Sequence, residues 1–476
     1  MKRIALVLLM AVCGAAHAAL PPPVARAFRQ AGVPLDHVAI VVQETGKAKP
    51  MISHEAAKPM NPASAMKLVT TFAALELLGP DYRWTTQAFL DGSLDHGVLH
   101  GNLVLKGHGD PKITIEQWQG FMAKLVAQGL SEIDGDLILD RSFFAPGPYD
   151  PAAFDGEPLK PYNVGPDALL LSFNSVRFVF SPSPENAAVA VTVEPPIANL
   201  RISATPRLVA GDCGDWHAAM RPVFIDRHDA AEASFPGTFP AACGERDWYV
   251  ALLDHAQFVR ATFALMWGGA GGSFSGRVRD GRVPAGATPI AVLESPPLYD
   301  VVRDINKMSN NVMARQLFLT LATTAYPPPA TTQHAAAAVR RWLASRKLAF
   351  PELVLENGSG LSRHERIAAR SMARLLDAAY ASDVQADYVS SLAVAATDGT
   401  VRKRFENETV AEQAFLKTGS LEGVRAIAGY VFAPDGRRYV VVCMVNHPNA
   451  ARAQPALDLL VEWVYAVGDS SRNVAR

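Results

Sequence analysis

The sequence predicts an α+β fold, in which both ends of the chain form an antiparallel sheet with helices around a large β-rich insertion. Near the C-terminus, the apolar runs Gly429–Phe432 and Tyr439–Val445 flank the turn Ala433-Pro434-Asp435-Gly436, a pattern typical of a hairpin. Between about residues 84 and 288, short strand-like runs alternate with turn residues. Apolar residues then recur at helical spacing in Tyr299–Leu321, Gln333–Ala344 and Ala369–Ala381.

These changes of pattern predict the domain organisation. We expect residues 19–83 and 289–476 to form one discontinuous catalytic domain, and residues 84–288 to form an insertion of two nested domains. The strand-like runs of the insertion are Leu103–Leu105, Leu137–Leu139, Val176–Phe180, Ala188–Val193 and Trp248–Leu252. A further run, Ile290–Leu293, lies just past the expected boundary. Outside the insertion we expect a strand at Val38–Gln43, a helix at Ser64–Leu78 that stops at Gly79-Pro80, and a last helix at about Pro455–Val467.

The first 18 residues have the three parts of a secretory signal peptide. Lys2 and Arg3 precede the apolar run Ile4–Val12, which is too short to span a bilayer, and Ala16-His17-Ala18 fits the cleavage site. The alternative is a buried N-terminal helix. No later run is long and uncharged enough for a membrane span. We therefore expect an exported protein, periplasmic or otherwise extracytoplasmic, with at most peripheral membrane association.

The charge balance excludes several classes of partner. The chain has 45 basic and 46 acidic residues, a net charge of −1, and 49% hydrophobic residues. This is an ordinary globular composition, without the basic excess that nucleic acids or anionic lipids attract.

The cysteines suit an exported protein. Cys213 and Cys243 lie in polar, glycine-containing segments and are expected to form a disulfide, whereas Cys443 lies in an apolar run and is expected to be a buried free thiol. No Cys/His cluster has zinc spacing, and we interpret His364-Glu365 as a surface pair. The sequence therefore predicts neither a metal nor a cofactor.

The string Ser64-Ala65-Met66-Lys67 places a hydroxyl and an amine one helical turn apart. Burial and a neighbouring cation can lower the pKa of a lysine enough for it to take the proton of a serine. If Ser64 starts its helix, its backbone N–H is also free to face a reacting carbonyl. The alternative is an N-capping serine followed by a solvated lysine.

The second string is Ser309-Asn310-Asn311, in a helical stretch near an expected break. Ser309 is a candidate for relaying a proton to a leaving nitrogen. Asn311 can donate to a substrate carbonyl and contact Lys67. Taken alone, this string is more typical of a polar turn.

The third string, Lys417-Thr418-Gly419-Ser420, precedes the C-terminal strands. A glycine there would let a substrate backbone pair closely with the strand edge. The Lys417 charge and the hydroxyls of Thr418 and Ser420 suit a substrate carboxylate. The alternative is an exposed edge lysine beside a turn. The three strings fall on a helix start, a helix break and a strand, which is the context that a Ser–Lys acyltransferase requires.

Beyond these strings, the chain resembles the low-molecular-mass class C penicillin-binding proteins, a family of D-alanyl-D-alanine carboxypeptidases and endopeptidases. The resemblance covers nearly the whole mature chain and includes the position of the insertion. It rests on Pro62–Leu68 with Leu78-Gly79-Pro80, Gly107–Pro111, Tyr162–Gly165, Asn174-Ser175, Glu356–Arg363 and Asp398-Gly399-Thr400. One departure is His108, which stands where the family has a glycine in the turn Gly107–Pro111.

The resemblance implies a transpeptidase-like domain of the penicillin-binding and serine β-lactamase type. Ser64 would be the nucleophile, Lys67 its general base, and Ser309 the proton shuttle. Asn311, Lys417, Thr418 and Gly419 would bind the substrate, and the backbone N–H groups of Ser64 and Ser420 would form the oxyanion hole. The implied substrates are peptidoglycan stem peptides ending in D-Ala-D-Ala and cross-links with a similar D,D bond, and β-lactams would acylate Ser64.

Two alternatives to a D,D-peptidase remain. A serine β-lactamase uses the same three strings, but the sequence has no Glu-x-x-Leu-Asn string to position a deacylating water, and Ser309 stands where class C lactamases have a tyrosine. The other alternative is a non-catalytic cell-wall-binding protein in which the insertion is the functional part. A pure binding protein has no use for Ser64, Lys67, Ser309 and Lys417 together.

Overall fold

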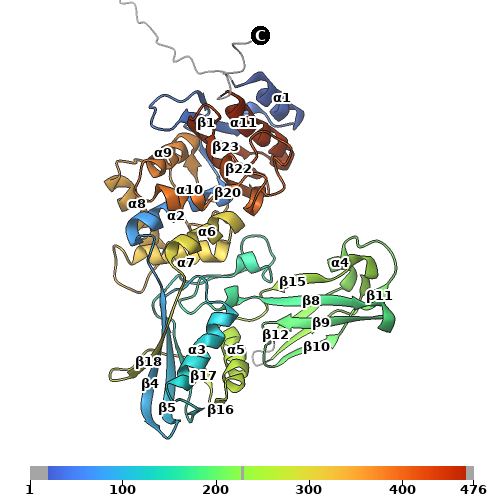
Figure 1. The fold of residues 1–476 in the computed structure, drawn as a ribbon, viewed down its shortest axis with the longest axis vertical. Helices are drawn as coiled ribbons and strands as arrows, with labels where there is room; N and C mark the ends of the chain where they lie inside the picture. Colours follow the sequence, from blue (N-terminus) through green and yellow to red (C-terminus); the bar gives the residue numbers. More distant parts are fainter. Residues whose placement is uncertain (1–19, 227–229, 468–476) are drawn as a thin grey trace, which may run out of the picture.

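The computed structural model describes residues 20–226 and 230–467, so the predicted signal peptide lies outside the described residues. The upper part of the molecule contains a six-stranded sheet of order β2-β1-β23-β22-β21-β20, in which every neighbouring pair is antiparallel (Figure 1). Its strands are β1 (Val38–Glu44), β2 (Ile52–His54), β20 (Ala393–Val394), β21 (Ala414–Leu421), β22 (Val424–Phe432) and β23 (Arg438–Asn446). The predicted C-terminal hairpin is β22 and β23.

Strands from the two ends of the chain lie side by side in this sheet. β1 pairs with β23 from Val38 opposite Val445 to Glu44 opposite Tyr439. A short second pairing joins β3 (Pro59–Met60) to β19 (Ile367–Ala368). The segments before and after the insertion therefore contribute strands to the same sheets.

β23 is apolar and buried from Tyr439 to Val445 because helices cover both faces of the sheet. Val441, Cys443 and Val445 pack with α1 (Pro22–Gln30) and α11 (Gln454–Val467). The alternate residues Val440 and Val442 face a second cluster on the opposite side. The helices of that second cluster are α2 (Lys67–Leu78), α6 (Leu298–Met308), α7 (Asn311–Ala322), α8 (Thr332–Ser345), α9 (Ala369–Tyr380) and α10 (Gln385–Ser390). Cys443 is a buried free thiol, as predicted.

The inserted region begins with a mixed sheet below α6 and α7 (Figure 1). Its strands are β4 (Thr85–Asp95), β5 (Val98–Gly107), β6 (Glu132–Ile133), β7 (Leu137–Asp140), β16 (Ser273–Phe274), β17 (Val278–Asp280) and β18 (Thr288–Glu294). β18 pairs with β4, so the run predicted just outside the insertion belongs to the insertion's own sheet.

The insertion was expected to be mostly β, and two long helices in it, α3 (Ile115–Ala127) and α5 (His255–Gly269), were not predicted. Both begin with a capping box, Thr114 with Gln117 and Asp254 with Gln257, in which each side chain bonds the backbone of the other residue. These boxes were the local sequence signal for the two helices.

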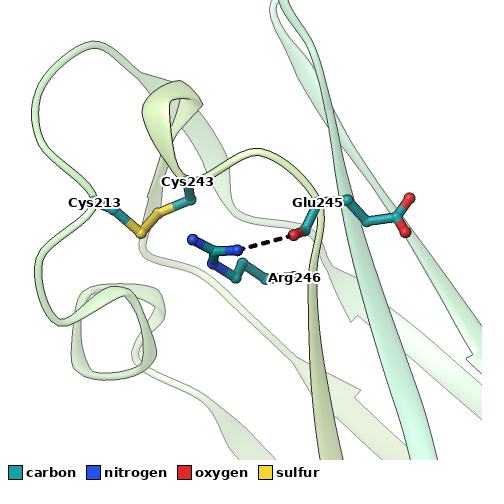
Figure 2. Close-up of a disulfide and its surroundings, with 4 residues drawn as sticks. All are labelled: Cys213, Cys243, Glu245 and Arg246. Carbon is teal, nitrogen blue, oxygen red and sulfur yellow. Dashed lines mark hydrogen bonds between the residues drawn. A yellow bond between two sulfur atoms is a disulfide. The ribbon is translucent and has the colours of Figure 1, made fainter. Parts of the chain in front are cut away.

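The rest of the insertion projects sideways as a small set of sheets with an aromatic core (Figure 1). Its elements are β8 (Val176–Ser183), β9 (Ala188–Glu194), β10 (Leu200–Ala204), β11 (Arg207–Val209), α4 (Trp216–Met220), β12 (Val223–Asp226), β13 (Ala231–Ser234), β14 (Thr238–Pro240) and β15 (Arg246–Val250). The predicted disulfide between Cys213 and Cys243 is present here, beside Glu245 and Arg246 (Figure 2). Among the residues described, no helix is long and apolar enough to cross a membrane.

Candidate active site

Ser64 lies in a tight turn that leads into α2. A 3-10 turn spans Ala63–Met66, and the α-helix begins only at Lys67, so Ser64 does not itself open the α-helix as expected. The turn is sharp because Ala63 has a φ of 47°, a conformation that side chains disfavour. The Asn61 side-chain oxygen accepts from the Ala63 N–H at 2.8 Å and supports this backbone. The half-buried Ser64 still faces Lys67.

Lys67 lies at the centre of the site and is fully buried. Its Nζ donates to Ser64 Oγ at 3.0 Å, to Asn311 Oδ1 at 2.5 Å and to the Ser359 carbonyl at 2.5 Å. Three acceptors match the three hydrogens of an ammonium group. The first two strings of the sequence are therefore in direct contact.

The environment of Lys67 disfavours its charged form. Burial lowers the pKa of Lys67 well below its ordinary value, and the charges of Lys417 and Arg315 lower it further, while Glu365 opposes them. A lysine with a lowered pKa can lose its proton near neutral pH and accept one from the Ser64 hydroxyl.

The second string occupies a break between two helices. The predicted helix over Tyr299–Leu321 divides at Ser309, which ends α6 in a left-handed conformation with a φ of 56°. The Asn310 side chain caps α7 by accepting from the Met313 N–H at 3.0 Å. This geometry turns Ser309 toward the sheet and Asn311 toward Lys67.

The third string lies on β21 and meets Ser309. Lys417 Nζ donates to Ser309 Oγ at 2.8 Å, and burial lowers the pKa of Lys417 to about 7. Thr418 Oγ1 donates to Thr400 Oγ1 at 2.8 Å, and the Ser420 side chain is exposed. The structure thus brings the three predicted strings together at one place, where α2, α6 and α7 adjoin the sheet (Figure 1).

The glycine of this string also has a packing role, which the sequence did not predict. A Cβ on Gly419 would lie 2.4 Å from the carbonyl oxygen of Pro62 and 3.1 Å from the Ala63 Cβ. Gly419 therefore lets β21 approach the turn that carries Ser64. The structure thus adds close packing within the protein to the predicted role of this glycine, which is close pairing with a substrate.

The loop of residues 356–363 completes the surroundings of Lys67, and its contribution was not predicted. Besides the bond from Lys67 to the Ser359 carbonyl, Thr70 Oγ1 donates to the Gly358 carbonyl at 2.7 Å. A Cβ on Gly360 would lie 1.9 Å from the Ala63 carbonyl oxygen. The only sequence signal was the glycine-rich string itself.

The interpretation of His364-Glu365 as a surface pair is wrong for Glu365, which is fully buried. Its Oε1 accepts from the N–H groups of Glu356, Asn357 and Gly358 at 3.0, 3.0 and 3.1 Å. Burial raises the pKa of Glu365, and these three bonds oppose that rise because they favour the carboxylate form. In the described part of the chain, no group of three or more His, Cys, Asp or Glu residues could hold a metal ion.

Comparison with solved structures identifies the fold. Penicillin-binding protein 4 (dacB) of Haemophilus influenzae superposes with a TM-score of 0.77 at 22% identity, covering 93% of this chain and 99% of that chain. A predatory endopeptidase of Bdellovibrio bacteriovorus, determined with an immunity protein, gives a TM-score of 0.53 at 16% identity and covers 91% and 94%. The chain thus has the fold of the penicillin-binding serine peptidases.

Sequence comparison gives the family. The D-alanyl-D-alanine carboxypeptidase DacB of H. influenzae is 26% identical over 386 residues, which are 81% of this chain and 80% of the relative. A D-alanyl-D-alanine carboxypeptidase of an Actinomadura species is 26% identical over 435 residues, 88% of this chain and 79% of the relative. The model of the D-Ala-D-Ala carboxypeptidase 3 (S13) family matches residues 23–466, so the chain belongs to this family.

Proposed function

We propose that the chain is a serine D,D-peptidase that cleaves the D-Ala-D-Ala bond of peptidoglycan stem peptides, and also D,D cross-links, through an acyl-enzyme on Ser64. Its family and the activity that its relatives' names carry support this substrate class. The observation that carries the mechanism is the contact of Lys67 Nζ with Ser64 Oγ at 3.0 Å, in surroundings that lower the pKa of the lysine.

In the proposed acylation step, Lys67 takes the proton of the Ser64 hydroxyl as Oγ attacks the carbonyl of the penultimate D-Ala. The backbone N–H groups of Ser64 and Ser420 stabilise the negative charge that develops on the carbonyl oxygen. Ser309, hydrogen-bonded to Lys417, relays to the leaving nitrogen the proton that Lys67 took from Ser64, and the C–N bond breaks. Water then hydrolyses the ester and restores Ser64.

The proposed substrate position lies along the free edge of β21. β20 pairs only with Phe415 and Leu416, so the described residues provide no strand partner on that side of Lys417–Ser420. An extended peptide can add there as a further strand. Lys417, Thr418 and Ser420 supply a positive charge and two hydroxyls for the terminal carboxylate, and Asn311 binds the peptide on the opposite side.

The same site suits β-lactams, whose reactive amide resembles the scissile bond. We propose that they acylate Ser64 and remain as stable esters. Penicillin-binding protein 4 of H. influenzae, which shares this fold, has also been solved in complex with a β-lactam.

We also propose a division of the chain between catalysis and the insertion. Residues 19–83 and the chain after β18 supply the catalytic unit, and the insertion extends to residue 294 because β18 pairs with β4. Residues 1–18 would direct export, so that the enzyme works on the wall outside the cytoplasm.

Labelling with a fluorescent penicillin tests this function. We expect the purified mature protein to be labelled covalently and Ser64→Ala to remain unlabelled. An unlabelled wild type would disprove the acyltransferase proposal, and labelling of Ser64→Ala would disprove the nucleophile. Rapid release of the label as penicilloate would favour a β-lactamase. Release of D-Ala from a pentapeptide and cleavage of a cross-linked muropeptide then measure the two peptidase activities separately.

A further inference from the structure

Two buried charged side chains outside the three strings, Glu365 and Arg315, shift the pKa of Lys67 in opposite directions. Glu365 is fully buried, and Arg315 is only 4% exposed. Arg315 follows Asn311 by one turn of α7. Neither residue forms a direct ion pair within the described chain. Buried charges without a direct partner are costly, so their retention beside a reactive lysine requires an explanation.

Glu365 shapes the loop that contacts Lys67. Its Oε1 accepts hydrogen bonds from three consecutive backbone N–H groups, those of residues 356–358. The next residue, Ser359, supplies the carbonyl that accepts from Lys67. Its other oxygen, Oε2, is buried without a hydrogen-bond partner. The carboxylate therefore fixes an acceptor of Lys67 through the backbone.

Arg315 connects the catalytic helix to the insertion. Its Nη1 donates to the carbonyls of Tyr162 and Val164 at 3.0 and 2.7 Å, and its guanidinium lies 5.5 Å from the centre of the Tyr149 ring. Carbonyl dipoles and an aromatic face solvate the cation without neutralising it. Its positive charge therefore persists in the interior, one turn from the Asn311 side chain that holds Lys67.

We propose that Glu365 and Arg315 are positioning residues that form a balanced pair of buried charges around Lys67. Glu365 favours the ammonium form of Lys67 and Arg315 favours the neutral form. The proposal rests on the proposed role of Lys67 as the base. It assigns to the insertion a part in the chemistry, because the insertion's carbonyls hold Arg315 in place.

The other charged groups on the elements that surround Lys67 either act on its pKa in a known direction or are held in ion pairs. Lys417 on β21 acts in the same direction as Arg315, and Glu365 is the carboxylate that opposes them. Lys307 on α6 is paired with Asp398, and Glu76 at the far end of α2 is paired with Arg346. Removing Glu365 or Arg315 should therefore change the balance in opposite directions.

The test is the pH dependence of the rate of penicillin acylation, whose acid limb reports the loss of the proton from Lys67. We expect Glu365→Gln to move the midpoint of this limb to lower pH, because a counter-charge of the ammonium is lost. Arg315→Met should move it to higher pH, because a repelling cation is lost. Each shift should be on the order of one pH unit, and the double variant should return toward the wild type.

Controls separate electrostatics from structure. Arg315→Lys keeps the charge and should keep the wild-type midpoint, and Asp435→Asn, in a remote turn, should leave the profile unchanged. Shifts of both single variants in the same direction, or rates that fall equally at every pH, would overturn the proposal.

A second readout does not depend on catalysis. The reaction of Lys67 with trace acetic anhydride at different pH values, followed by peptide mass spectrometry, should show the same opposite shifts. If the wild type is not acylated by penicillin, the proposed function fails, and this readout still decides the charge balance. If acylation occurs but neither readout shifts, only the charge balance fails.

Discussion

Asn61 and Asn446 exchange a reciprocal pair of hydrogen bonds between the turn before Ser64 and the end of β23. The side-chain oxygen of Asn446 accepts from the Asn61 N–H at 2.8 Å, and its amide donates to the Asn61 carbonyl at 2.9 Å. Asn61 in turn accepts from the Ala63 N–H. The Asn446 side chain thus takes the place of a neighbouring strand and ties the turn that carries Ser64 to the sheet.

Asn446→Ala should therefore loosen the Ser64 turn. We expect penicillin acylation to slow by about 10- to 100-fold, since small displacements of a nucleophile have such effects. Two lost hydrogen bonds should also lower the free energy of unfolding by about 1–3 kcal/mol. Stopped-flow acylation and urea unfolding measure both quantities. Asn186→Ala, which removes a single bond on the surface, is the control. An unchanged acylation rate in Asn446→Ala would contradict this role.

Gly419→Ala should impair catalysis through packing alone. The added methyl group would meet the Pro62 carbonyl at 2.4 Å and push the Ser64 turn away from β21. We expect acylation to fall by about 100-fold or more. The matched control is Gly120→Ala, in the middle of α3, where nothing lies within 4 Å of the new methyl group. That variant should acylate normally and be slightly more stable, because alanine favours helices. Equal acylation rates in the two variants would contradict the packing explanation.

Asp110 should make stability decrease as the pH rises. Burial raises the pKa of Asp110 from 3.8 to about 7, and its Oδ2 has no hydrogen-bond partner. In the unfolded chain the group ionises near pH 4, so between pH 4 and 7 the folded state binds more protons and loses stability with rising pH. Asp110→Asn should remove this cost and raise the free energy of unfolding at pH 8 by up to about 4 kcal/mol.

At pH 4 the same substitution should have little effect, because Asp110 is then protonated in the folded protein. Thermal melts at the two pH values provide the measurement, and Asp435→Asn serves as an exposed-turn control. A stabilisation of the same size at both pH values would show that ionisation is not its cause.

The disulfide should stabilise the insertion without acting on catalysis. Cys213 and Cys243 are 30 residues apart in sequence, and closing a loop of this length contributes about 3–4 kcal/mol in the chain-entropy description. We expect the double substitution Cys213→Ala with Cys243→Ala to lower the melting temperature while leaving penicillin acylation at 25 °C unchanged. Loss of acylation in a folded double variant would instead connect this outer part to the active site.

The sequence predicted the parts of the site that local patterns express. Ser64 and Lys67 are three residues apart, Ser309 marks a helix break, and the apolar run of β23 follows from burial on both faces. These features depend on neighbours in sequence, so periodicity and turn chemistry identify them.

The missed features depend on contacts between distant segments. The Ser359 carbonyl reaches Lys67 only through tertiary packing, and Arg315 contacts carbonyls of the insertion. Glu365 was expected on the surface because carboxylates seldom lie inside a protein, and the three backbone N–H groups that stabilise it are arranged only by the folded loop. The helices α3 and α5 were missed for a different reason, since their capping boxes were present in the sequence but were outweighed by the surrounding strand-like runs.

The pairing of β1 with β23 sets the order in which the molecule can become active. β1 precedes the insertion in the sequence and is synthesised before it, whereas its partner β23 follows the insertion. The insertion can bury its own core earlier, since domains fold largely as units. The turn that carries Ser64 can form its hydrogen bonds to the sheet only after Asn446, at the end of β23, has been synthesised. A chain cut short before β23 would therefore carry the nucleophile and the insertion but would lack the contacts that tie the Ser64 turn to the sheet.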